Sequence, residues 1–210
     1  MKKFEAIILS GGKGTRVKKY TKKIPKCLIE INGKPFLYHQ LEYLKKNNIK
    51  DVIVSVNYLG GKIKSYLKKN IDFINTKIVN DGKRPLGTGG AIIKSLRFLK
   101  KNFYIIYGDS YLNFNLKKLA KKKNLVTMAV FRNNNKYDKS NIELQKLKKI
   151  LYFKKIPKKK LFYIDYGVSY INKRIFKGIK KNTKLDLAIL FEKISQNNML
   201  KGFEVKKRFY

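Results

Sequence analysis

The stretch Ala6-Ile7-Ile8-Leu9-Ser10-Gly11-Gly12-Lys13-Gly14-Thr15-Arg16, followed by Pro25-Lys26, decides the fold of this chain. Its apolar beginning predicts a buried strand over residues 4–9 that stops in a glycine-rich turn. Glycines permit positive φ and let a ligand approach the main chain, and successive amide N–H groups in such a turn form an anion site. Lys13, Arg16 and Lys26 add positive charge at the same place. The stretch therefore predicts a strand that leads into a phosphate-binding loop.

This loop differs from the two common phosphate-binding motifs. A dinucleotide-binding fingerprint requires a third glycine at a position where this chain has Val17. A P-loop requires a glycine where the chain has Ile7 and a hydroxyl residue where it has Gly14. Neither motif accounts for the sequence.

Strand and helix patterns alternate on the C-terminal side of the loop. The expected helices cover residues 35–46, 60–69, 92–99 and 186–194, and the expected strands cover 51–56, 77–80, 103–107, 126–131 and 161–170. This alternation predicts an α/β fold with a mainly parallel sheet and helices on both faces. Ligands bind beyond the carboxyl ends of the strands in such sheets, where the loops at Ser10, Gly87 and Asp109 meet. We therefore expect one site at that edge.

Several motifs, taken together and in this order, resemble those of the sugar-1-phosphate nucleotidyltransferases (NDP-sugar pyrophosphorylases). The loop matches the family pattern G-G-x-G-T-R followed by P-K. Further matches are Lys34-Pro35-Phe36-Leu37, Pro85-Leu86-Gly87-Thr88-Gly89-Gly90-Ala91 and Gly108-Asp109. The pattern is most similar to the short bacterial branch that includes heptose-1-phosphate guanylyltransferases and N-acetylmuramate-1-phosphate uridylyltransferases.

The resemblance implies a single-domain, Rossmann-like (GT-A-like) fold over residues 1–210, with mainly parallel strands in a mixed sheet. Residues 1–125 correspond to a nucleotide-binding half, and residues 126–210 correspond to a sugar-phosphate-binding half. In the family a second metal-binding acid comes from a segment near the C-terminus, and this chain ends at Arg208-Phe209-Tyr210, where that segment begins. We expect that the chain is truncated there; the alternative is an unusual partner for the first metal ligand.

The implied reaction joins an NTP to a sugar 1-phosphate and releases pyrophosphate, with Mg²⁺ as cofactor. Such a reaction needs cations, a metal and fixed geometry more than a proton-shuttling base. By resemblance, Arg16 clamps the β- and γ-phosphates and Lys26 lies near the α-phosphate or the sugar phosphate. Asp109 follows an apolar strand and is the expected metal ligand, since Mg²⁺ binds carboxylate, phosphate and water oxygens. We expect Arg16, Lys26 and Asp109 to be the catalytic residues.

The resemblance also indicates which residues contact the nucleotide. The set is Leu9, Ser10, Gly11, Gly12, Lys13, Gly14, Thr15, Asp81, Gly87 and Thr88. Gly87 allows the base to lie against the backbone, and Thr88 begins a helix whose N-terminal dipole favours anions. Asp81 either accepts hydrogen bonds from a guanine edge or is a solvated turn residue. The heptose-like motif pattern favours GTP among the nucleotides.

Three residues of the second half correspond to the family's sugar-phosphate contacts. Gly167 matches the glycine of the family's N-A-G-I-Y strand, whose amide faces the sugar. Asp165 replaces the asparagine there, and it either binds sugar hydroxyls or lies in a loop. Lys155 carries over from a Glu-Lys pair as a sugar-phosphate contact, whereas Lys154 departs from that pattern.

The net charge of +38 raises the alternative of a nucleic-acid-binding protein. Only six of the 51 basic residues are arginine and the lysines are spread along the chain, which favours a compositional drift over a specific nucleic-acid surface. No apolar run reaches transmembrane length, no signal-peptide pattern is present, and a single cysteine fits a reducing compartment. We therefore expect a cytoplasmic enzyme for surface-polysaccharide synthesis, with no membrane partner, and leave homo-oligomerisation open. A further alternative is a nucleotide-binding module without turnover.

Overall fold

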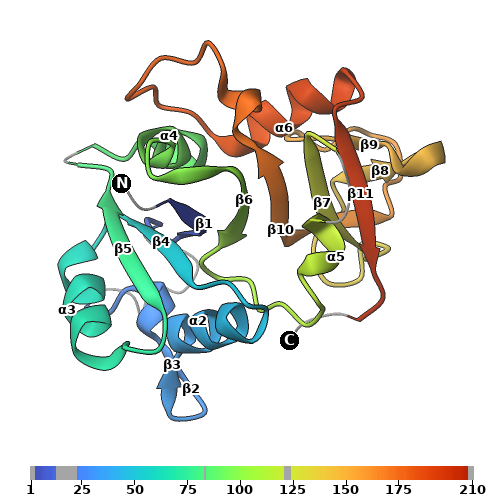
Figure 1. Ribbon diagram of the computed structural model, residues 1–210. Helices are drawn as coiled ribbons and strands as arrows, with labels where there is room; N and C mark the ends of the chain where they lie inside the picture. Colours follow the sequence, from blue (N-terminus) through green and yellow to red (C-terminus); the bar gives the residue numbers. More distant parts are fainter. Residues whose placement is uncertain (1–2, 13–22, 83, 121–123, 208–210) are drawn as a thin grey trace.

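A single mixed sheet, in the strand order β11-β7-β10-β6-β1-β4-β5, runs through the protein (Figure 1). The computed structural model describes residues 3–12, 23–82, 84–120 and 124–207. The strands on this path are β1 (Phe4–Leu9), β4 (Asp51–Val56), β5 (Asn75–Asn80), β6 (Leu99–Tyr107), β7 (Val126–Arg132), β10 (Tyr163–Asn172) and β11 (Leu200–Val205). A hairpin of β8 (Ile142–Leu144) and β9 (Ile150–Tyr152) extends from β10, and a small separate ribbon joins β2 (Glu30–Ile31) to β3 (Lys34–Pro35).

The predicted mainly parallel sheet is confirmed. β1 is parallel to both of its neighbours, so that Ile7 lies between Ile53 of β4 and Ile105 of β6. β5 continues the parallel arrangement beside β4, and β11 lies parallel to β7. Only β10 runs against its neighbours on this path, pairing antiparallel with β6 and β7. The carboxyl ends of β6, β1, β4 and β5 therefore meet at one edge.

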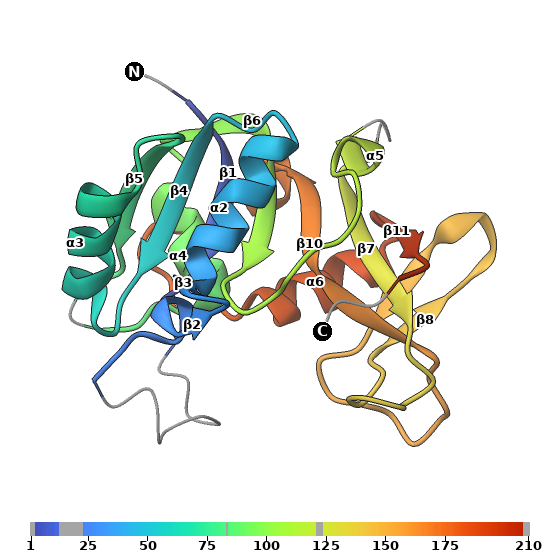
Figure 2. The ribbon, with the colours of Figure 1, turned by 90° about the horizontal axis from the view of Figure 1, so that it is seen from below.

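Helices cover both faces of the sheet, as predicted (Figures 1 and 2). The helices α2 (Phe36–Lys46), α3 (Gly60–Asn70) and α5 (Lys117–Ala120) pack on the face that includes Ile8 of β1. The helices α4 (Gly87–Ser95) and α6 (Leu187–Gln196) pack on the other face, which includes Ile7. Because successive side chains of a strand point to opposite faces, the apolar run of β1 supplies both cores.

The boundary between α4 and β6 was predicted wrongly. The apolar spacing continues to Leu99, but α4 ends at Ser95, and Leu99 opens β6 opposite Phe4 of β1. A register shift separates this pair from the regular pairing that begins at Ala6 and Tyr104, which explains why the polar residues 100–102 interrupt the strand pattern. The strand β11 and the hairpin β8–β9 were not predicted at all.

Among the described residues, no helix has the length and apolar character needed to cross a membrane.

Candidate active site

A cavity of about 600 Å³ opens at the edge where β1, β4, β5 and β6 end. It is lined by Leu9, Ser10, Gly11, Gly12, Lys26, Cys27, Ser55, Asp81, Pro85, Gly87, Thr88, Ala91, Tyr107, Gly108 and Asp109. This position of the cavity agrees with the expectation of one site at the carboxyl edge of the sheet. Nine of the expected site residues within the described part of the chain, from Leu9 to Asp109, lie around this single space.

The loop after β1 begins at the floor of this cavity. The Ser10 amide donates to the Ser55 carbonyl at 2.8 Å, which holds the loop's first residue beside the end of β4. Gly11 and Gly12 follow on the wall of the cavity. The expected residues Lys13, Gly14, Thr15 and Arg16 lie outside the described residues.

Lys26 and Asp109 meet across the mouth of the cavity, although 83 positions separate them in the chain. The Lys26 Nζ lies 2.8 Å from Asp109 Oδ2, with 39% of the lysine side chain and 52% of the aspartate side chain exposed. Because the pair is half-exposed, each side chain can release the other and bind a ligand instead. The neighbouring Cys27 is buried, and burial raises the pKa of its thiol to about 11, so this residue packs as an apolar side chain at neutral pH.

Gln40 holds the loop that carries Asp109, and no sequence motif had indicated this residue. Its buried Nε2 donates to the carbonyl oxygens of Tyr107 and Ser110, at 2.9 Å each. The two bonds span the turn on both sides of Asp109. Because a glutamine on an apolar helix face has no distinctive spacing, only the tertiary structure reveals this role.

The residues around Asp109 fit a magnesium ion that is shared with substrate phosphates. The described residues contain no cluster of three or more histidine, cysteine or acidic side chains that could hold a metal. Asp109 provides one half-exposed carboxylate at the mouth of the cavity. Mg²⁺ is commonly bound by one or two carboxylates together with phosphate oxygens and water. Asp109 would hold the ion, which would supply positive charge next to the phosphates.

Asp81 is buried at the wall of the cavity, with 8% of the residue exposed. Burial raises the pKa of its carboxyl group above the ordinary value, while a backbone hydrogen bond from Leu86 and the charge of Lys94 act in the opposite direction. The Ser55 hydroxyl donates to Asp81 Oδ1 at 3.5 Å. The alternative of a solvated turn residue is therefore wrong, and the carboxylate is a shielded acceptor beside the nucleotide loop.

The glycine-rich turn at Gly87–Gly90 forms the first turn of α4, and two of its amide groups donate to the protein's own backbone. The amides of Gly89 and Gly90 both donate to the Leu185 carbonyl, at 2.9 and 3.1 Å. Gly87 has a φ of +75°, and a Cβ there would lie 2.6 Å from the same Leu185 oxygen. These two amides are therefore bound by the segment that precedes α6, and the expectation that the N-terminal dipole of this helix favours an anion stays a prediction.

Two of the three residues expected to contact the sugar phosphate, Asp165 and Gly167, belong to β10. Asp165 belongs to this strand, at a register shift against β7, so the alternative that it lies in a loop is wrong. Its Oδ1 accepts from the Gly167 amide at 2.8 Å, and burial raises the pKa of the carboxyl group to about 7. The Gly167 amide, expected to face a sugar, is engaged by this carboxylate. Lys155 is exposed in the connector after β9, without an ion pair to another described residue.

Tyr107 is the last residue of β6, the strand that pairs with β10. Its ring lines the cavity, and burial raises the pKa of its hydroxyl well above the ordinary value. The charges of Asp165, Asp186 and Asp109 raise the pKa of this hydroxyl further.

Comparison with known proteins agrees with this geometry. Residues 5–200 match the family described as Nucleotidyl transferase. The D-glycero-alpha-D-manno-heptose 1-phosphate guanylyltransferase of Campylobacter jejuni is 38% identical over 94% of this chain and 87% of its own length. The protein of the same name from Aneurinibacillus thermoaerophilus is 30% identical over 98% of this chain and 87% of its own. The crystal structure of HddC from Yersinia pseudotuberculosis complexed with GMP-PN is 25% identical, has a TM-score of 0.77, and matches 97% of this chain and 91% of that one.

Proposed function

The chain belongs to the nucleotidyl transferase family, and we propose that it joins GTP to a sugar 1-phosphate, giving a GDP-sugar and pyrophosphate. The observation that carries the proposal is the single cavity that brings Lys26 and Asp109 together with the buried carboxylate of Asp81. The names of the two guanylyltransferase relatives support a heptose as the sugar.

In the proposed reaction a phosphate oxygen of the sugar 1-phosphate attacks the α-phosphorus of GTP. A new P–O bond forms there as the bond to the β-phosphate breaks, and pyrophosphate leaves with the bonding electron pair. Two polyanions must come together, so fixed positive charge lowers the barrier. Lys26 supplies such charge at the mouth of the cavity. We assign the β- and γ-phosphates to Arg16, and the remaining loop contacts to Lys13, Gly14 and Thr15.

Guanine fits the buried carboxylate better than the other bases do. Its edge offers two adjacent donors, N1–H and the 2-amino group, and an ionised carboxylate has only acceptors. Adenine and cytosine place a ring acceptor beside their amino group, and uracil offers a single donor between two acceptors. We therefore assign base recognition to Asp81, with the base lying against Gly87.

We assign residues 1–125 to nucleotide binding and residues 126–210 to the sugar phosphate, with Asp165 and Gly167 shaping the sugar side and Mg²⁺ held at Asp109. The product is an activated sugar, which suits the synthesis of surface polysaccharides from a cytoplasmic pool of GTP.

A coupled pyrophosphate-release assay tests the proposal directly. The four common NTPs are crossed with heptose, mannose and glucose 1-phosphates, with and without Mg²⁺. We expect Mg²⁺-dependent release with GTP and one sugar, and loss of this activity in Arg16→Ala and Asp109→Ala. Nucleotide binding without release for any pair would refute the proposed reaction and favour a binding module.

A further inference from the structure

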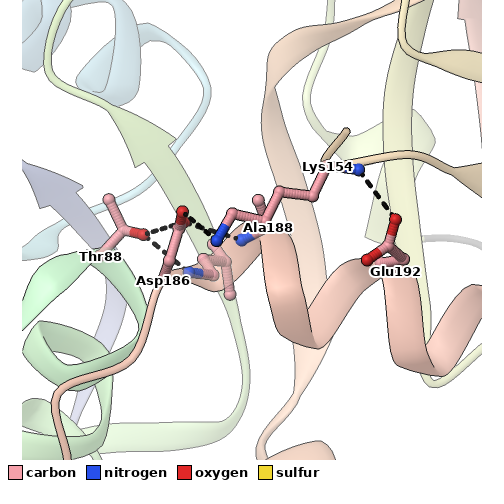
Figure 3. Close-up of polar contacts among 6 residues, drawn as sticks. Thr88, Lys154, Asp186, Ala188 and Glu192 are labelled. Carbon is pink, nitrogen blue, oxygen red and sulfur yellow. Dashed lines mark hydrogen bonds and ion pairs between the residues drawn. The ribbon is translucent and has the colours of Figure 1, made fainter. Parts of the chain in front are cut away.

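The start of α4 and the start of α6 are joined by hydrogen bonds at the boundary between the two halves (Figure 3). The Leu187 amide donates to Thr88 Oγ1 at 2.8 Å, and Thr88 Oγ1 donates to Asp186 Oδ1 at 3.2 Å. The Leu185 amide donates to the Leu86 carbonyl at 2.8 Å. Because Thr88 also lines the nucleotide cavity, this junction connects the cavity wall to the segment that begins α6.

The two carboxylate oxygens of Asp186 face different partners. Oδ1 accepts from the Ala188 amide at 3.0 Å, which caps α6, and also from Thr88. Oδ2 lies 3.5 Å from the ammonium group of Lys154 (Figure 3). One side chain therefore contacts the nucleotide wall, the helix cap and a lysine of the connector that follows β9.

Lys154 is anchored at its backbone and loosely held at its tip. Its amide donates to Glu192 Oε1 of α6 at 3.1 Å, which fixes where the side chain begins. The ion pair with Asp186 is 3.5 Å long, and 43% of the Lys154 side chain is exposed. Such exposed pairs contribute little to stability, so an incoming phosphate can compete for the ammonium group. The ammonium group is therefore held near Asp186 by a weak, half-exposed ion pair.

We propose that Asp186 is a positioning residue that aims Lys154 at the phosphate of the sugar substrate while bracing Thr88 on the nucleotide side. The inference rests on the proposed function and deepens it, because it names the cation of the sugar-phosphate subsite and the group that couples this subsite to the nucleotide wall. It assigns to Lys154, rather than to Lys155, the contact that the family resemblance implied for the latter.

Four variants test this assignment in the pyrophosphate-release assay. Lys154→Gln removes the ammonium group, and Asp186→Asn removes the charge that aims it while keeping an oxygen acceptor at the helix cap. Asp186→Ser is a second variant that keeps a capping hydroxyl. Lys193→Gln is the matched control, since Lys193 is an exposed lysine of α6 without an assigned role.

We expect Lys154→Gln to raise the KM for the sugar 1-phosphate about tenfold, the lower end of what one charge-assisted hydrogen bond contributes. The KM for GTP should stay within about twofold. Both Asp186 variants should raise the same KM, and the double variant Asp186→Asn/Lys154→Gln should resemble Lys154→Gln alone because the two groups act as one unit. The control should match the wild type.

Three kinetic results would each overturn the inference in an active enzyme. They are a normal KM for the sugar 1-phosphate in Lys154→Gln, fully additive effects of the two substitutions, or a larger effect of Lys155→Gln than of Lys154→Gln. An inactive wild-type protein would instead refute the proposed function itself. A lowered melting temperature in Asp186→Asn with both KM values raised equally would show a helix cap only, and would also overturn the inference.

Discussion

Replacement of Asp81 by asparagine should abolish the preference of the enzyme for guanine. The residue is 8% exposed, so its carboxylate would meet the base in a site largely shielded from water. Asparagine keeps one acceptor but presents a donor where the second acceptor was, and this donor faces a donor of guanine. A lost charge-assisted hydrogen bond costs about 1.5–3 kcal/mol and an unpaired buried donor about 1–3 kcal/mol, so a total of at least about 3 kcal/mol is expected. This corresponds to a loss of roughly a hundredfold or more in kcat/KM for GTP.

ITP provides the matched substrate control, because it lacks only the 2-amino group of GTP. The wild-type enzyme should prefer GTP to ITP roughly tenfold, the value of one such hydrogen bond, and Asp81→Asn should show no such preference. The assay is pyrophosphate release at pH 8, since burial raises the pKa of Asp81 and acidic buffer would protonate it. The Ser55 hydroxyl can still donate to the asparagine oxygen, so the melting temperature should change little. An unchanged ratio of GTP to ITP in the variant would refute guanine recognition by Asp81.

Three further predictions concern the catalytic pair, the sugar side and the packing of β10. Lys26→Ala and Asp109→Ala should each lower kcat at least about a hundredfold. The free energy of unfolding should stay within about 1 kcal/mol of the wild-type value, because the ion pair is exposed. A much lower melting temperature in either variant would contradict this. Asp165→Asn should become increasingly stable relative to the wild type as the pH rises from about 4 to about 7. The Asp165 carboxyl group has a pKa of about 7 in the folded state and about 3.8 in the unfolded state, so its titration destabilises the wild type between these pH values. Asparagine does not titrate, so the variant escapes this loss. A constant difference in melting temperature between variant and wild type at all pH values would contradict the reasoning. Gly167→Ala should lower the unfolding free energy by more than Gly178→Ala. Both positions have φ near +90° (+91° and +84°), but only a Cβ at Gly167 meets a neighbour, the hydroxyl oxygen of Ser110. Equal losses measured by chemical denaturation would show that this contact relaxes.

The elements that could be predicted from the sequence are those whose apolar pattern has clear limits within the element's own residues. The apolar runs of β1 and β4 are bounded by polar residues, and their predicted and observed limits coincide. The limit between α4 and β6 could not be predicted, because Leu96 and Leu99 continue the helical spacing although they belong to the helix cap and to the next strand. Only the pairing of Leu99 with Phe4 separates the two interpretations.

In the candidate site, the sequence predicted which residues take part but not the environment of each side chain. The motifs predicted that Asp81 and Asp165 belong to it, but whether each carboxylate is solvated depends on elements distant in the chain. The glycine-rich turn at 87–90 led to a base-binding interpretation, whereas a Cβ at Gly87 or Gly89 would lie within 3 Å of Leu185. Sequence spacing cannot distinguish a glycine that makes room for a ligand from one that makes room for the protein's own backbone.

The placement of Asp109 illustrates why the site depends on contacts without any motif. A Cβ at Gly108 would lie 2.6 Å from the Leu9 carbonyl oxygen, so the loop after β6 lies directly against the end of β1. Gln40 of α2 holds the same loop from the opposite face, and Gly167 of β10 lies against Ser110 just beyond it. The loop is thus fixed by a parallel strand, a helix and the antiparallel strand at once. Since β10 carries Asp165 and Gly167, which we propose shape the sugar side, the carboxylate that would hold the metal lies on a loop that both halves of the sheet restrain.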